Sequence, residues 1–400
     1  MKTFRKPLKV LLQEYCLEKS SHPTKMEDKI SRLVIPDLFN PIIAKPDQIH
    51  PQFLMLKNST IHEAARNLLN DIFSKLPNPD NHFAREFQSQ GFNSRVFELG
   101  LFQLLAETGF KISQEFDAPD YMLTKGKLRI AVEAVASSPK IVGKNTLNDI
   151  KKLSAAAEKN RAMHDFPIRA GSSLFSKIKK RYWELEQFKN IPLVFAYQAL
   201  HEGGSLFFKP EYLIEYLFGV RLNDRFVTGF AKKNDKGHRK GEKKIPSGFF
   251  NQPDVENLSA VLFTNGLTIP KFFRMADIGE KNSSVDWYRR GIAYLPHPRF
   301  IVGLKFQYNR KDKLAAKEDW SQSAMLIHNP NAIHPIQPFL FPQFSHAFLR
   351  DGLLSIEVPR FHPIMSQMLM FGGHKKKPKK TGTKKAKVKS RPNKPVGKKR

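Results

Sequence analysis

The sequence predicts an α/β protein built on a mixed sheet. Residues 111–116 and 118–135 have the apolar patterning of strands, and the continuously apolar "IPLVFAY" at 191–197 is typical of a strand buried on both faces. Helical periodicity covers residues 94–108 and 173–188, before and between these strands. The order is therefore helix, three strands, helix and strand. This αβββαβ order predicts a core whose sheet combines parallel and antiparallel strands.

Residues 1–89 are expected to form a partly helical N-terminal region. Thr60 and Glu63 have the spacing of a capping box, which predicts an amphipathic helix that ends near Lys75. The segment "LPNPDN" at 76–81 contains two prolines and ends that helix.

Residues 90–200 form the predicted core. Asn93 or Ser94 can cap its first helix, and Gly109 can end it. We take Lys125-Gly126 as the two-residue turn of a hairpin, because glycine adopts the positive φ that such a turn needs. The polar residues 137–172 are interpreted as an insertion or a mobile segment ahead of the next helix.

Residues 201–373 are expected to form a C-terminal α+β extension. Its predicted elements are a helix at 211–218, strands near 258–264, 300–307 and 353–358, and a basic loop at 231–244. Residues 374–400 have almost no side chains that could form a core, which predicts a disordered basic tail.

Charge is the most unusual property of the composition. Sixty-seven Lys and Arg residues against 37 Asp and Glu residues give a net charge of +30. Fourteen of the basic residues lie at 375–400, where there is no acid, so the rest of the chain still carries +16. This excess predicts attraction to polyanions, with nucleic acid as the first candidate and anionic lipid as the second.

Cysteine usage and hydropathy bear on the compartment. The single cysteine, Cys16, excludes a disulfide framework within one chain, and a reducing, cytoplasmic location is expected. The N-terminus lacks the apolar core of a signal peptide, and no run of about 18 apolar residues predicts a membrane span. We therefore expect no membrane partner.

Two acids of the hairpin are predicted to share one face of the sheet. With the turn at 125–126, Asp120 pairs with Ala131, and Glu133 becomes its diagonal neighbour at a Cα separation of roughly 7–8 Å. Side chains alternate between faces along a strand, so both carboxylates point the same way and can converge on one hard divalent cation. A plain turn role for Asp120 and an ion pair between Glu133 and Arg129 are the structural alternatives.

A third acid, Glu98, lies on an apolar face of the first core helix. Leu101, Phe102 and Leu105 share that face by their spacing. A carboxylate there costs stability unless it is satisfied, which suggests a role at the same site. Arg95, three residues earlier, is its ordinary structural partner.

These acids resemble the motif of the PD-(D/E)XK nuclease superfamily, which has the restriction-endonuclease-like fold. The match rests on Pro119-Asp120, on Glu133-Ala134-Val135 thirteen residues after that aspartate, and on the preceding Glu98, and it covers about residues 90–200. The resemblance implies hydrolysis of phosphodiester bonds in nucleic acid, DNA foremost, with Mg²⁺ or Mn²⁺ as cofactor. It assigns Asp120 and Glu133 as metal ligands and Glu98 as the acid of the first helix.

One position departs from the family pattern. The family's catalytic lysine would stand at position 135, where this chain has Val135. Some members are thought to supply the lysine from a neighbouring element, and here Lys177 and Lys180 share one face of the following helix. We take Lys177 as the first candidate and Lys180 as the second.

Direct contacts with nucleic acid are predicted in two places. One is the aromatic and basic segment that contains Lys271 and Arg274, for which buried packing of its phenylalanines is the structural alternative. The other is the basic tail, where we name Lys375, Lys376, Lys377, Lys384 and Lys385. Whether the chain also forms a homodimer or binds a partner protein is left open.

Two alternatives to a nuclease follow from the same residues. Val135 is consistent with a non-catalytic nucleic-acid-binding protein on a degenerate nuclease scaffold. The long stretch of residues 203–373, in which we identify no site, is consistent with an interaction component of a larger complex.

Overall fold

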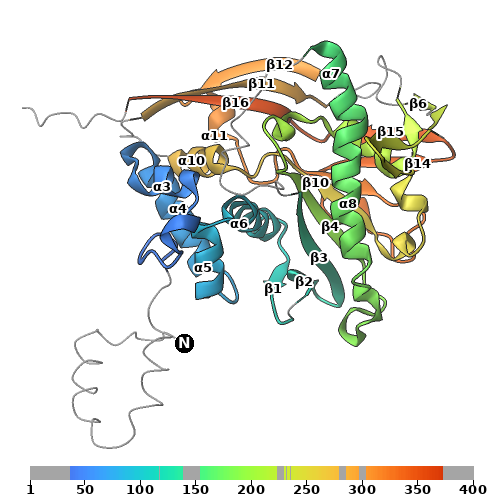
Figure 1. Ribbon diagram of the computed structural model, residues 1–400, viewed down its shortest axis with the longest axis horizontal. Helices are drawn as coiled ribbons and strands as arrows, with labels where there is room; N and C mark the ends of the chain where they lie inside the picture. Colours follow the sequence, from blue (N-terminus) through green and yellow to red (C-terminus); the bar gives the residue numbers. More distant parts are fainter. Residues whose placement is uncertain are drawn as a thin grey trace, which may run out of the picture.

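A nine-stranded mixed sheet organises the molecule (Figure 1). The computed structural model describes residues 37–116, 118–137, 154–222, 229–230, 232–234, 236–278, 285–296 and 303–372. In spatial order the strands are β1 (Lys111–Ser113), β2 (Tyr121–Lys125), β3 (Leu128–Ser137), β4 (Leu193–Ala199), β10 (Ala260–Phe263), β13 (Met325–His328), β14 (Ser345–Arg350), β15 (Leu353–Glu357) and β6 (Gly229–Phe230).

Strand directions in this sheet are mixed, as the sequence predicts. β1, β2 and β3 form an antiparallel meander, and β3, β4 and β10 are parallel to one another. β13 is antiparallel to β10 and parallel to β14. The sheet thus continues from the αβββαβ block into residues beyond 200, where β10 pairs directly with β4.

Helices cover both faces of the sheet (Figure 1). One core contains side chains of α3 (Pro51–Asn58), α4 (Glu63–Ser74), α5 (Asn81–Gln88), α6 (Phe92–Ala106) and α10 (Ile269–Asp277). The opposite core contains side chains of α8 (Phe166–Ile178) and α9 (Pro210–Phe218). β4 is buried along its whole length because it has a core on each side, which explains why all of its residues except Gln198 are apolar.

A smaller sheet packs above the first core. Its strands are β12 (Gly303–Asn309), β11 (Val285–Tyr294) and β16 (His362–Gly372), with β11 in the centre. Trp287 and Tyr308 extend from this sheet into the same core as α4 and α6. Figure 1 shows the three long strands crossing over the end of the larger sheet.

The remaining short elements are α11 (Lys313–Ala316) and two two-stranded ladders. The ladders pair β5 (Val220–Arg221) with β7 (Lys232–Lys233), and β8 (His238–Lys240) with β9 (Lys243–Ile245). The segment that we predicted to be a basic loop, residues 231–244, therefore includes most of a hairpin.

The helix before β4 lies further upstream than predicted. Residues 154–172 are not a polar insertion: α7 (Ala155–Asn160), a π-helical turn (Arg161–Asp165) and α8 follow one another there. Phe166, Ala170, Leu174 and Ile178 recur every four residues and give α8 its buried face. The helix ends at Ile178, because Arg181 adopts a left-handed conformation with φ 49°, and only short 3₁₀ turns follow to Phe188. Residues 138–153 lie outside the described residues.

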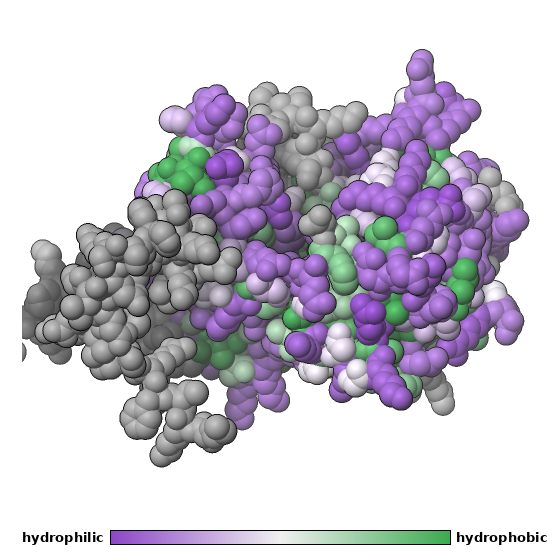
Figure 2. Space-filling model, turned by 90° about the horizontal axis from the view of Figure 1, so that it is seen from below, coloured by the Kyte–Doolittle hydropathy of each residue, from purple (hydrophilic) through white to green (hydrophobic). Residues whose placement is uncertain are grey.

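Hydrophilic side chains dominate the face of the molecule shown in Figure 2. Figure 2 shows a face on which apolar side chains come in small, separate groups. No helix in the described part of the chain is both long and apolar enough to cross a bilayer.

Candidate active site

The β2–β3 hairpin brings Asp120 and Glu133 together, in a register that differs from the prediction. Lys125 pairs with Leu128, so the turn is Gly126-Lys127 rather than Lys125-Gly126, and Gly126 has φ +60°. The ladder continues to the pair Tyr121 and Val132, which places Asp120 beside Glu133 instead of Ala131. Because the register differs by two residues, the face on which each side chain lies is unchanged.

Hydrogen bonds join the two acids through the backbone. The Asp120 N–H donates to Oε2 of Glu133 at 3.2 Å, and the Ala134 N–H donates to Oδ2 of Asp120 at 2.7 Å. Glu133 is 2% exposed in the middle of β3. A buried carboxylate without partners would be strongly destabilising, so Glu133 depends on these hydrogen bonds in an otherwise apolar part of the strand.

Lys177 reaches this pair from α8. Leu174 and Ile178 pack α8 in the core that also contains Ala131 and Val135 of β3. The Lys177 ammonium donates a hydrogen bond to Oε1 of Glu133, and its side chain is 25% exposed. The predicted first candidate for the lysine thus contacts one of the two predicted metal ligands.

Tyr182 is a site residue that the sequence analysis missed. Its hydroxyl donates to the same Glu133 Oε1 at 2.7 Å. It lies in the 3₁₀ turn after α8, where we had predicted continuing helix. Lys180 does not contact the acids: its ammonium lies 5.7 Å from the centre of the Tyr182 ring.

Glu98 is held by its ordinary helical partner. Arg95 donates to its Oε2 at 2.5 Å, and the Tyr121 hydroxyl donates to its backbone carbonyl at 3.0 Å. The ion pair with Arg95, which was the structural alternative for Glu98, is therefore present. The carboxylate of Glu98 is still close enough to influence Asp120 electrostatically.

Crowding of the acids changes their protonation. The pKa of Asp120 is raised to about 7. Burial is the main cause, and the charges of Glu133 and Glu98 are part of the same increase. Burial also raises the pKa of Glu98, although Arg95 opposes it. For Lys177 burial acts in the lowering direction, but Glu133, Asp120 and Glu98 outweigh it, so the pKa of Lys177 is raised and the ammonium stays charged.

The charge and the donor atoms of the site fit a hard divalent cation. Three carboxyl groups face two cations, Arg95 and Lys177, and a bound metal ion would favour the charged form of Asp120. Carboxylate oxygens are the ligands that Mg²⁺ prefers, and Asp120 and Glu133 are the pair that would hold it. The described residues contain no group of three or more His, Cys, Asp or Glu side chains arranged to hold a metal ion.

The position of the family lysine is filled by the core. Val135 is 1% exposed and packs on the α8 side of the sheet. The ammonium group next to the acids therefore belongs to Lys177 of α8 and not to a residue of β3.

Two of the predicted nucleic-acid contacts are buried. Lys271 and Arg274 are 2% and 3% exposed and form ion pairs with Glu318, so their placement corrects the prediction that they contact a nucleic-acid backbone. The predicted tail contacts Lys375, Lys376, Lys377, Lys384 and Lys385 lie outside the described residues.

The raised pKa of Asp120 predicts a pH-dependent effect of Asp120→Asn on stability. The folded state favours the neutral carboxyl, so the stability contributed by Asp120 is complete below pH 3.8 and is lost as the pH rises through about 7. Asp120→Asn should therefore be more stable than the wild type at pH 8, by a margin that shrinks toward pH 4. Urea unfolding in EDTA measures this, and a pH-independent difference would contradict it.

Comparisons of the chain with protein-family models, with curated proteins and with solved structures give no match. Fold and site define an α/β protein with a carboxylate–lysine cluster where β2, β3 and α8 meet.

Proposed function

We propose that the protein hydrolyses phosphodiester bonds in nucleic acid with the help of a divalent metal ion, at a site of the restriction-endonuclease-like type. The observation that carries the proposal is the contact of Lys177 with Glu133, whose carboxylate is hydrogen-bonded to Asp120. The element order α6, β1, β2, β3, α8 and β4, with β3 and β4 parallel, supports it.

Each residue has a role that follows from its position. Asp120 and Glu133 would hold Mg²⁺ or Mn²⁺, which, when bound, polarises a phosphoryl oxygen and lowers the pKa of bound water. Lys177 stays protonated at neutral pH, so it would act as a hydrogen-bond donor to a phosphoryl oxygen or to the attacking water rather than as a base. Tyr182 positions Glu133 through its hydroxyl.

The charge of the chain supports a nucleic-acid substrate. A net charge of +30 attracts a phosphate backbone without regard to base sequence. Binding is therefore expected to weaken steeply with salt, and DNA is the substrate that the family resemblance favours.

One observation favours the alternative of a non-catalytic nucleic-acid-binding protein. Val135 is buried where the family has its lysine, and Lys177 already has a partner in Glu133. If Lys177 serves only to neutralise Glu133, the scaffold would bind nucleic acid without cleaving it.

Cleavage assays with a matched pair of lysine variants test the proposal. Plasmid, linear duplex and single-stranded substrates are incubated with Mg²⁺ or Mn²⁺, beside EDTA. We expect metal-dependent cleavage that Lys177→Met reduces by about 10²-fold or more, the size typical of losing one positioned transition-state group. Lys180→Met removes the same charge three residues away and should change the rate little.

The outcomes separate the two candidate functions. Cleavage that is lost in Lys177→Met and kept in Lys180→Met supports the nuclease. Salt-sensitive binding without cleavage under either metal supports the non-catalytic scaffold. Cleavage that survives Lys177→Met would contradict the role assigned to Lys177.

A further inference from the structure

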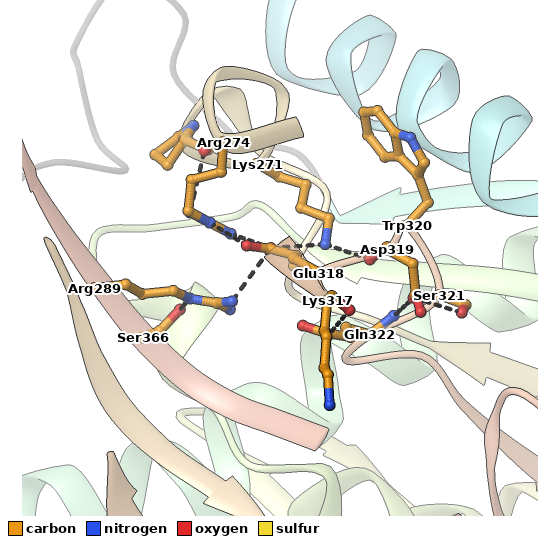
Figure 3. Close-up of polar contacts among 12 residues, drawn as sticks. Lys271, Arg274, Arg289, Lys317, Glu318, Asp319, Trp320, Ser321, Gln322 and Ser366 are labelled. Carbon is orange, nitrogen blue, oxygen red and sulfur yellow. Dashed lines mark hydrogen bonds and ion pairs between the residues drawn. The ribbon is translucent and has the colours of Figure 1, made fainter. Parts of the chain in front are cut away.

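A second polar cluster lies where α10 meets the smaller sheet (Figure 3). Lys271 and Arg274 of α10 and Arg289 of β11 all contact the carboxylate of Glu318. The ion-pair distances are 2.8 Å for Lys271, 2.8 Å for Arg274 and 3.2 Å for Arg289. All four side chains are less than 5% exposed.

The charges of this cluster do not balance. Three cations contact one carboxylate, so the bonded groups carry an excess of two positive charges, which the nearby carboxylate of Glu107 offsets only in part. The pKa of Lys271 is lowered to about 8. Burial is the main cause, Glu318 opposes the decrease, and the charges of Arg274 and Arg289 contribute to it. An uncompensated buried charge costs several kcal/mol, so an anion beside the cluster would be stabilising.

A cavity of about 410 Å³ adjoins the cluster on the side of the arginines. Arg274 and Arg289 both line it, whereas Lys271 does not. Ser366 and Met368 of β16 also line it, and they contact the two guanidinium groups: Arg289 donates to Oγ of Ser366 at 3.0 Å, and Arg274 lies 3.8 Å from Sδ of Met368. The volume is within the range of small-molecule sites.

Two further features of the wall point to a ligand. Gln198 of β4 is fully buried, lines the cavity, and leaves its Oε1 without a hydrogen-bond partner. The N-cap Thr268 and the first two residues of α10, Ile269 and Pro270, also line the cavity, so the partial positive charge of that helix N-terminus lies at its wall. The cavity also lies beyond the carboxyl ends of the parallel strands β4 and β10, where open α/β sheets bind ligands.

We propose that this cavity binds a small organic phosphate of mononucleotide size. Arg274 and Arg289 bind the phosphate, and the partial positive charge at the N-terminus of α10 adds to theirs on the same wall. The buried acceptor of Gln198 takes a hydrogen bond from an N–H or O–H donor elsewhere on the ligand, which a base or a sugar supplies. The ligand is either a free nucleotide or the phosphorylated end of a strand, which share this chemistry.

Isothermal titration of the full chain with AMP, GMP, CMP and UMP, in phosphate-free buffer with EDTA, tests the proposal apart from any cleavage. We expect saturable binding of at least one nucleotide, competition by inorganic phosphate and much weaker binding of the matching nucleoside. Arg289→Gln should weaken binding roughly tenfold or more, the size typical of a charge-assisted hydrogen bond. Arg290→Gln, at the exposed neighbouring position of β11, is the matched control and should leave it unchanged.

A second variant keeps the test decisive if Arg289→Gln does not fold. Gln198→Leu removes the unpartnered acceptor without changing charge, and it should weaken nucleotide binding several-fold. A 5′-phosphorylated oligonucleotide that competes with the nucleotide identifies a strand end as the source, and one that does not compete identifies the free nucleotide. Absence of binding at millimolar nucleotide, or binding that neither Arg289→Gln nor Gln198→Leu weakens, overturns the proposal.

Discussion

We expect Asp120→Asn to lower the rate of metal-dependent cleavage by about 10²- to 10³-fold, the range typical of removing one group that stabilises the transition state. An amide keeps an acceptor for the Ala134 N–H but carries no charge with which to hold a divalent cation. Fold should be retained, since the change relieves the crowding of Asp120 with Glu133 and Glu98.

Metal binding gives a readout of the same variant that does not depend on turnover. Mg²⁺ should raise the melting temperature of the wild type, because a ligand that binds the folded state stabilises it, and the increase should be much smaller in Asp120→Asn. Asp71→Asn is the matched control: Asp71 is an exposed carboxylate of α4, paired at the surface with Lys75. Equal Mg²⁺ stabilisation of all three proteins would show that Asp120 is not a metal ligand.

Glu318→Gln is expected to have the largest effect on stability, a loss of about 3–5 kcal/mol in the free energy of unfolding. Burial by itself would raise the pKa of Glu318, but Arg274, Lys271 and Arg289 hold it well below its usual range, so the carboxylate is charged in the folded protein. Neutralising it leaves three buried cations without their shared partner. Urea unfolding at pH 7 measures the loss.

The neighbouring residue provides the control for Glu318. Asp319 also forms an ion pair, with Arg360, but both side chains are about one third exposed. Asp319→Asn should therefore cost about 1 kcal/mol or less, since exposed pairs contribute little. A similar small loss in Glu318→Gln would mean that its interior cations find compensation elsewhere.

The hairpin could be predicted from the sequence because its signals are local. Alternation of side chains fixes which residues share a face, and that parity survives an error of two in register, so Asp120 and Glu133 were placed together although the turn was misplaced by one residue. Lys177 could also be predicted, since it lies on the helix between β3 and β4.

Other parts of the site depend on contacts that no local pattern encodes. Tyr182 reaches Glu133 only because α8 ends at Ile178, and that end depends on the left-handed conformation of Arg181. The Glu318 cluster joins residues up to 47 positions apart in the chain. Lys271 and Arg274 were predicted to contact nucleic acid because basic and aromatic residues occur together in that segment, and only the fold places them beside Glu318.

The pairing of β4 with β10 has a consequence for dissecting the protein. The core predicted from the sequence ends at residue 200, yet its last strand, β4, lies between β3 and β10 inside the nine-stranded sheet and not at its edge. A fragment cut at residue 200 would present the seven residues of β4, six of them apolar, as an open edge, with backbone groups ready to pair with another molecule. The residues beyond 200 thus cover that edge within the same chain, because β10 pairs with β4.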